Sequence, residues 1–210
     1  MSRSQRRPSR ILWISVILLL LCSGFSGVAS AAIAPVAQTS GAVFHAPLGT
    51  LPRLLDHLLR ETHRLRAVVT GPQDAAHLTV FFDPDCPFCA RFWQTLWPRH
   101  RDYRIRWIPV AYARPDSNRV AAAILLASDP QAALVHNEEG FHFRQHHGGL
   151  MPIYHLPADL AKAITNNSDF WRHWFGMLPV FFYRSTTGVH LFVGRPTSTQ
   201  WRHVHQVALP

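Results

Sequence analysis

The sequence is poor in charged residues and in cysteine, and it contains no internal repeat. Charged residues make up 16% of the 210 positions and hydrophobic residues 48%, which excludes an intrinsically disordered chain. Three cysteines are too few for a disulfide-stapled scaffold, and eleven glycines without a period exclude a collagen-like chain. Without repeats or low-complexity runs, the length fits one domain with a small appendage.

Acidic residues are also scarce. Twelve Asp and Glu stand against 21 Lys and Arg, which gives a formal net charge of +9. The basic residues form no run interleaved with aromatic residues, so the sequence predicts no nucleic-acid partner. A solvated basic surface is the preferred interpretation, and attraction to acidic partners or an anionic membrane surface is the alternative.

The first 31 residues have the layout of a secretory signal peptide. Four arginines precede an apolar run over residues 11–21, and the triplet Ala29-Ser30-Ala31 provides a cleavage site. The run is shorter than the roughly 18 residues that a membrane span needs, and an uncleaved N-terminal anchor is the alternative. Cleavage after residue 31 would leave 179 residues, a net charge of +5 and two cysteines, Cys86 and Cys89.

Hydrophobic periodicity and turn residues predict an α/β chain. Residues 32–50 are small and turn-prone and form a lead-in. Residues 51–68 are predicted to form an amphipathic helix, because leucines recur at helical spacing between charged residues. The other predicted elements are a buried strand at 78–82, a helix that opens at the Cys86–Cys89 motif and stops at Pro98, a strand at 103–111, helices within 117–139 that break at Asp129-Pro130, a loop at 140–157, a helix at 157–175, strands at 180–183 and 189–193, and a helix at 197–207.

The motif Cys86-Pro87-Phe88-Cys89 directly follows the first buried strand and opens a helix. A C-x-x-C pair alone is a weak signal, because it can be a redox pair, half of a metal site or an inert staple. Here Cys86 is at the helix N-cap, where free N–H groups favour the thiolate and lower its pKa below the ~8.5 of a free cysteine. Cys89 lies one turn deeper on the apolar face. The pattern favours a redox pair in which Cys86 attacks and Cys89 resolves.

Two other positions are candidates for this chemistry. Asp83, three residues before Cys86, is a candidate proton acceptor for Cys89, although an acid at such a position more often caps the helix or faces solvent. Leu178-Pro179 precedes the third strand. A cis bond there would place the Leu178 backbone beside the cysteines, ready to pair with an extended substrate. An ordinary trans proline that opens a strand is the equal alternative.

Fourteen histidines are an unusual number for this length, and several crowd the loop at 140–157. A zinc or copper site needs three or four converging ligands, and no histidine pair has helical ligand spacing in a strong context. The sequence therefore predicts no metal and no cofactor. The histidines concerned are His142, His146, His147, His155, His203 and His205. Five tryptophans are assigned to the core, with the rim of a hydrophobic substrate groove as the less favoured alternative for some of them: Trp93, Trp97, Trp107, Trp171 and Trp174.

The order of strand, C-P-F-C, helix, helical insertion and x-Pro-strand-hairpin-helix resembles the thioredoxin fold. Residues 80–93, VFFDPDCPFCARFW, resemble the DsbC/DsbG branch of periplasmic thiol:disulfide interchange proteins and are nearer DsbG. The alanine-rich run at 121–125, the Ala127–Pro130 segment and Val193-Gly194-x-Pro196 are similar to that branch's insertion and final hairpin. The resemblance covers roughly residues 43–207.

This resemblance implies a particular domain organisation. An amphipathic linker helix, with its lead-in, occupies 32–72, and a thioredoxin-like domain occupies 73–210 with a helical insertion at about 115–175. In the family a dimerisation domain precedes the linker helix. Only nineteen residues separate position 32 from Leu51, too few for such a domain, so we expect a monomer or a weak dimer.

The resemblance also implies roles for residues around the cysteines. Leu178–Pro179 is then the family's cis-proline loop, and Leu178 and Pro179, with Pro87 and Phe88, are the predicted substrate contacts. Leu178 stands where DsbC and DsbG usually carry threonine, so the family's redox potential is not carried over.

The predicted function is an exported, periplasmic thiol:disulfide oxidoreductase that acts through Cys86 and Cys89. Its predicted partners are cysteine-containing exported proteins and a membrane redox partner that resets the dithiol. One alternative is a dedicated periplasmic thiol reductase for a single partner. Another is a chaperone or metal-binding module without turnover. The direction of electron flow depends on the reduction potential, which the sequence does not fix.

Overall fold

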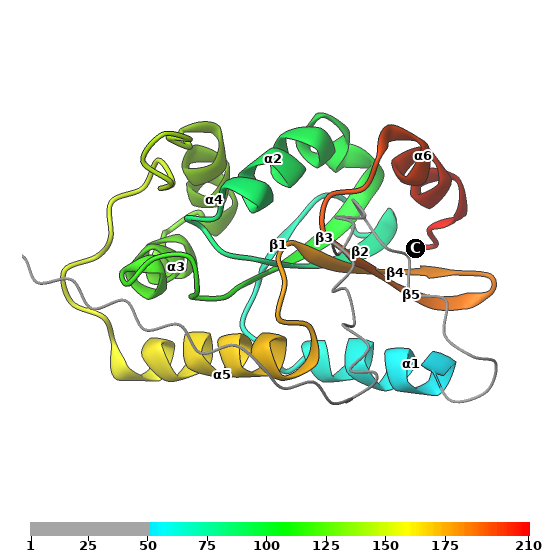
Figure 1. The fold of residues 1–210 in the computed structure, drawn as a ribbon, viewed down its shortest axis with the longest axis horizontal. Helices are drawn as coiled ribbons and strands as arrows, with labels where there is room; N and C mark the ends of the chain where they lie inside the picture. The colour runs from blue at the N-terminus through cyan, green and yellow to red at the C-terminus, as the bar shows by residue number, and fades with distance from the viewer. Residues whose placement is uncertain (1–50) are drawn as a thin grey trace, which may run out of the picture. The chain divides into compact units, whose positions relative to one another are not determined.

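The structure is a computed structural model that describes residues 51–210. The predicted signal peptide at 1–31 and lead-in at 32–50 lie outside the described residues. No helix within residues 51–210 combines the length and the apolar character that crossing a membrane requires. The predicted α/β architecture is confirmed, with a five-stranded sheet between helices (Figure 1).

The strand order is β1-β3-β2-β4-β5. The central strand β2 (Ala76–Phe82) pairs in parallel with β3 (Tyr103–Pro109) and antiparallel with β4 (Val180–Ser185). The edge strands are β1 (Val68–Thr70), antiparallel to β3, and β5 (Gly188–Val193), antiparallel to β4. Because β2 and β3 are parallel, the chain must cross over the sheet between them, and it does so through the helix that carries the cysteines.

Helices cover both faces of the sheet (Figure 1). On one face α1 (Leu51–Thr62) and the end of α5 (Ala158–Trp174) pack on alternate strand residues. On the other face lie α2 (Pro87–Leu96) and α6 (Ser198–Val207). The first cluster contains Leu55, Leu58, Phe81, Ile108, Trp171, Val180 and Phe182, and the second contains Val80, Phe82, Phe92, Trp107, Phe181, Phe192 and Trp201. The period of two along β2 and β4 divides their side chains between these two cores.

The predicted insertion lies between β3 and β4 in the chain. It contains α3 (Ser117–Leu126) and α4 (Pro130–Glu139), which break where predicted, and then the loop that leads to α5. Asp129 caps α4 by accepting the Ala132 N–H at 2.9 Å. Buried Ile124 of α3 and Leu134 of α4 join the same core cluster as the two cysteines. These two helices of the insertion therefore pack on the cysteine side of the sheet, whereas the end of α5 packs on the other face.

The helix predicted at 51–68 is wrong at its C-terminal end. It ends at Thr62, whose hydroxyl donates to the Leu59 carbonyl at 2.6 Å, and residues 68–70 form β1 instead. Arg106 of β3 donates to the carbonyls of Thr62, His63 and Leu65 and satisfies this end of the helix. The β-branched run then pairs with β3, so the sheet includes residues before position 73.

Three smaller predictions also need correction. Pro98 does not end the helical structure, because a 3₁₀ helix, η1 (Trp97–Asp102), continues from α2. The strand predicted at 103–111 ends at Pro109, although the Val110 N–H still donates to the Phe82 carbonyl at 2.8 Å. Trp174, assigned to the core, is 42% exposed at the end of α5, whereas Trp97 is partly buried and packs against the core.

Candidate active site

The two cysteines lie where the central strand meets α2. Cys86 is the N-cap of α2 with extended backbone angles (φ −90°, ψ 118°), and Pro87 occupies the first helical turn. The Cys86 N–H donates to the Asp83 carbonyl at 3.0 Å, and the Cys86 carbonyl accepts the Ala90 N–H at 3.0 Å. Proline suits this position because the first N–H of a helix has no partner within the helix. The local sequence therefore sets the position of the Cys86 sulfur at the start of the helix.

The two thiols have different environments although both are free. Cys86 is 8% exposed and Cys89 is 2% exposed. The Cys89 thiol donates to the Cys86 sulfur and lowers the pKa of Cys86; the N–H groups of Cys89 and Phe88 act in the same direction against the effect of burial. Burial, followed by the hydrogen bond to Cys86, raises the pKa of Cys89 well above its ordinary value. The pair thus consists of a slightly exposed sulfur that favours the thiolate and a more deeply buried sulfur that favours the thiol.

This asymmetry predicts selective alkylation. Brief iodoacetamide treatment of the reduced protein at mildly acidic pH should label Cys86 and leave Cys89 unlabelled, because the thiolate is the reactive species. Peptide mass spectrometry after the quench gives the ratio of the two products. Preferential labelling of Cys89 would contradict the assignment of the attacking sulfur.

The Leu178–Pro179 peptide bond is cis, as the resemblance implies. Hydrogen bonds anchor the loop on both sides: Trp171 Nε1 donates to the Met177 carbonyl at 2.8 Å, and the Gly194 N–H donates to the Pro179 carbonyl at 2.7 Å. Leu178 is half-buried and packs against both core clusters, one of which contains Cys86 and Cys89. The structure therefore brings the predicted loop and the cysteines to one apolar cluster.

The other predicted substrate contacts differ in exposure. Phe88 is 66% exposed and Pro87 is half-buried, so the segment between the cysteines presents apolar surface to solvent. Two exposed side chains that the sequence did not single out have the same character. Met177 precedes the cis bond and is 61% exposed, and Tyr112 is 67% exposed. Scattered exposed apolar residues are ordinary, but these belong to segments that also carry or contact the site.

Asp83 is fully buried and neither caps α2 through its side chain nor faces solvent. Its carboxylate accepts three backbone N–H groups, from Asp85 at 2.8 Å, Tyr112 at 2.6 Å and Ala113 at 2.7 Å. Burial raises the pKa of Asp83 to about 6, although the three N–H donors oppose this shift. Asp83 is therefore ionised at neutral pH and protonated in mild acid.

A buried polar network behind Cys86 escaped the sequence analysis. Asp85 accepts the Ser117 hydroxyl at the start of α3 and the Gly148 N–H of the insertion loop, both at 3.0 Å. Asn137 of α4 donates through Nδ2 to the Pro84 carbonyl at 2.9 Å. The insertion thus holds the segment before Cys86 at three points. The Gly148-Gly149 doublet is the feature of the sequence that is compatible with a close approach in this loop, but it does not identify the neighbour.

The histidine-rich loop brings two imidazoles together without a third ligand. His142 and His147 form an isolated β-bridge, and their ring centroids are 4.6 Å apart. His205 Nδ1 instead lies 2.8 Å from the Tyr103 hydroxyl. Within residues 51–210, no three side chains of His, Cys, Asp or Glu converge as metal ligands would.

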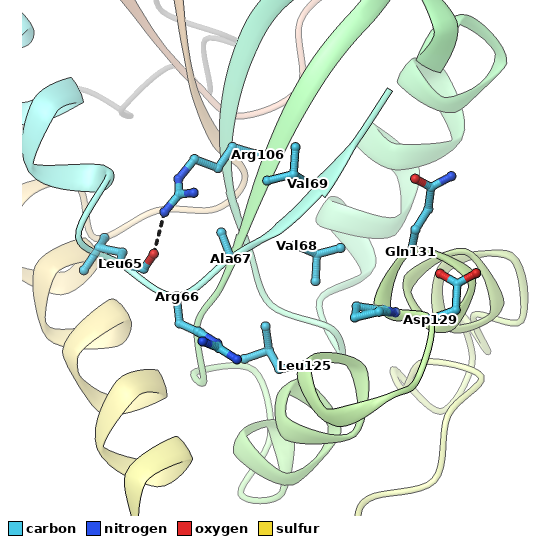
Figure 2. Close-up of a pocket in the computed structure, with 10 residues that line it drawn as sticks. Leu65, Arg66, Ala67, Val68, Val69, Arg106, Leu125, Asp129 and Gln131 are labelled. Carbon is cyan, nitrogen blue, oxygen red and sulfur yellow. Dashed lines mark hydrogen bonds between the residues drawn. The ribbon is translucent and has the colours of Figure 1, made fainter. Parts of the chain in front are cut away.

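A cavity of about 530 Å³ lies beside the edge strand β1, and neither cysteine lines it (Figure 2). Figure 2 shows Arg106 there with its guanidinium bonded to the Leu65 carbonyl. Arg106 therefore serves mainly as a hydrogen-bond donor to the carbonyls at the end of α1. The side chains and backbone that line this cavity belong to Leu65, Arg66, Ala67, Val68, Val69, Arg106, Leu125, Asp129, Pro130 and Gln131.

Comparison with solved structures shows the fold. The chain superposes on a periplasmic thioredoxin-like protein of Salmonella enterica serovar Typhimurium with a TM-score of 0.50 and 16% identity, covering 77% of this chain and 97% of that one. It superposes on the catalytic domain of Proteus mirabilis ScsC with a TM-score of 0.51 and 20% identity, covering 71% and 96%. The fold and the site together define a thioredoxin-like protein with a C-x-x-C dithiol at the start of a helix.

Comparison by sequence is more specific. The chain is similar to the thiol:disulfide interchange protein DsbG, with 30% identity over 125 residues to that of Pseudomonas aeruginosa and 35% over 89 residues to that of Escherichia coli. These matches cover 58% and 41% of this chain, but 47% and 34% of the relatives, so the chain spans less than half their length. No protein-family model matches the chain.

Proposed function

We propose that this chain is a thiol:disulfide oxidoreductase that exchanges disulfides with protein substrates. The observation that carries the proposal is the asymmetric pair at the start of α2. Cys86 is the N-cap with a lowered pKa, and Cys89 is buried with a raised pKa. An attacking thiolate and a protected resolving thiol are what stepwise exchange requires. Similarity to DsbG, a thiol:disulfide interchange protein, supports this assignment.

The exchange proceeds in two successive thiol–disulfide exchange steps. The Cys86 thiolate attacks a substrate disulfide, the substrate S–S bond breaks, and one substrate sulfur leaves as a thiolate. Cys89 then loses its proton and attacks the Cys86 sulfur of the mixed disulfide, which releases the second substrate sulfur. The substrate gains two electrons, and the Cys86–Cys89 disulfide forms. The reverse sequence oxidises a substrate dithiol.

We further propose Asp83 as the acceptor of the Cys89 proton. Its carboxylate is buried beneath the same helix start and is ionised at neutral pH. General-base assistance of this kind contributes about 10²-fold or more to a rate. Because the pKa of Asp83 is about 6, the resolution rate should fall as the pH drops through this value.

Asp83→Asn should therefore slow the resolution of mixed disulfides about 10²-fold and flatten the pH dependence around pH 6. Stopped-flow release of the second glutathione after reaction with oxidised glutathione measures this step. Asp74→Asn is the matched control, because Asp74 is exposed. A slow variant that keeps the wild-type pH profile would assign Asp83 a structural role only.

Substrate polypeptide would lie across Phe88 and the Leu178–Pro179 loop, where apolar surface is exposed beside the cysteines. Similarity to DsbG and to a periplasmic thioredoxin-like protein supports a periplasmic location, with export through residues 1–31. Cysteine-containing exported proteins would then be the substrates, and a membrane redox partner would reset the pair.

The equilibrium of the Cys86–Cys89 pair with glutathione tests the proposal directly. A measurable reduction potential is expected, and its value separates an oxidant from a reductant. Failure of the pair to exchange with glutathione would contradict the proposed function. A Cys86→Ala/Cys89→Ala double variant that still supports maturation of a partner protein would favour the chaperone alternative.

A further inference from the structure

A third carboxyl lies behind the cysteine pair, on the helical insertion. Glu138 is in the last turn of α4 and is 1% exposed. Its Oε1 accepts the Asn137 Nδ2–H at 3.1 Å, and the same amide donates to the Pro84 carbonyl at 2.9 Å. This side chain takes no part in the proposed exchange steps. A buried carboxyl is rare without a partner charge, so its protonation state needs an explanation.

The hydrogen bonds connect Glu138 to the backbone that holds Cys86. Asn137 joins the carboxyl to Pro84, and the adjacent Asp83 carbonyl accepts the Cys86 N–H at 3.0 Å. Gly148 lies directly against the Asn137 amide, because an added Cβ at Gly148 would be 1.9 Å from Asn137 Oδ1. These hydrogen bonds therefore connect the carboxyl to the segment that carries the attacking sulfur.

Three acidic groups act on Glu138. They are Cys86 of α2, and Asp83 and Asp85 of the segment before it. Burial first, and then the charges of these three groups, raise the pKa of Glu138 well above its ordinary value against the effect of the Asn137 hydrogen bond. Of the three, only Cys86 loses its charge when a disulfide forms.

We propose that the Glu138 carboxyl is a proton-binding group linked to the redox state of the Cys86–Cys89 pair. It holds a proton while Cys86 is a thiolate and releases it more readily once the disulfide has formed. This inference rests on the proposed function. When a substrate disulfide oxidises the pair, two electrons pass to the substrate sulfurs and the Cys86–Cys89 bond forms. The Cys89 proton is released. At a pH between the Glu138 pKa of the dithiol form and that of the disulfide form, the Glu138 proton is also released to solvent.

The direction of the linkage follows from the charges. A thiolate beside the carboxyl disfavours the carboxylate, so the pKa of Glu138 is higher in the dithiol form than in the disulfide form. Between these two pKa values, reduction takes up one additional proton. The equilibrium constant for reduction then falls by up to about tenfold more for each pH unit than it would without the group.

The composition of the chain makes a direct test practical. It contains three glutamates, Glu61, Glu138 and Glu139. Protein labelled with ¹³C at the glutamate carboxyl therefore gives three NMR signals, which Glu→Gln variants assign one at a time. Each signal is titrated in the disulfide and the dithiol form of the full chain. We expect the Glu138 midpoint to be higher in the dithiol form than in the disulfide form.

A second measurement follows the redox equilibrium itself. Glu138→Gln keeps the acceptor for Asn137 and should weaken the pH dependence of the equilibrium with glutathione. Glu139→Gln removes the same charge from an exposed neighbour and should leave this dependence unchanged. Identical Glu138 midpoints in the two redox forms would overturn the inference while leaving the proposed function intact. Absence of exchange with glutathione would instead reject the proposed function. The wild-type titration needs no variant to fold.

Discussion

A Cys86→Ser variant should lose disulfide exchange almost completely, whereas Cys89→Ser should accumulate mixed disulfides. Cys86 is the sulfur at the start of α2 with the lowered pKa, and removing an attacking nucleophile costs about 10³-fold or more. Cys89 is buried and protonated, so it does not take over the attack. Without Cys89, Cys86 still attacks a substrate disulfide, but nothing within the site releases the bound substrate.

Both variants should be made in a Cys22→Ser background, which leaves one thiol in each protein. Reduction of a disulfide-containing protein substrate gives the turnover, and non-reducing electrophoresis after an acid quench gives the mixed disulfides. Equal amounts of mixed disulfide at Cys86 and Cys89 would contradict the division of roles.

Gly148→Ala should cause a large loss of stability. The new Cβ would lie 1.9 Å from Asn137 Oδ1 and 2.4 Å from Nδ2, so Asn137 must move. Its movement breaks the hydrogen bonds to Pro84, Glu138 and the Leu150 N–H inside the protein. Overpacking together with unsatisfied buried polar groups costs about 3 kcal/mol in the free energy of unfolding.

Gly176→Ala is the matched control. Gly176 has φ +67°, but nothing lies within 4 Å of an added Cβ, so the cost is the backbone conformation alone, about 1 kcal/mol. Urea denaturation of the two variants measures the difference. If both lose the same free energy of unfolding, the packing between Gly148 and Asn137 is not the limiting contact. The rate at which Cys86 is alkylated should also change in Gly148→Ala and should stay constant in Gly176→Ala.

The sequence predicted those parts of the fold and site that depend on neighbours in the chain. Cys86 and Cys89 share a helical turn, and leucine and aromatic periodicity marks most helices and strands. The strand β1 was missed because three residues carry too little alternation to distinguish them from the end of an amphipathic helix. Residues 68–70 form a strand because they pair with β3, and the helix before them ends where the Arg106 guanidinium binds the Leu65 carbonyl.

The polar network behind Cys86 could not be predicted for a related reason. Asn137 and Pro84 are 53 positions apart, and Gly148 and Asp85 are 63 positions apart. No periodic pattern connects residues at such separations, and each side chain read alone is an ordinary helix or loop residue. Glu138 illustrates this most clearly, because the adjacent Glu139 has the same side chain and is exposed. Only the packing of α4 distinguishes the two.

The attachment of α1 has a consequence for the design of fusion proteins. Leu55 and Leu58 anchor this helix in the core beneath the sheet, and Arg106 binds the three carbonyls that follow it. The helix is therefore fixed rigidly to the domain and does not rotate relative to it. A reporter or a second binding module joined directly to Leu51 would project from the domain in one fixed direction. Extending α1 by single residues would rotate such a module by about 100° per residue, which makes its orientation toward Cys86 adjustable by helical phase.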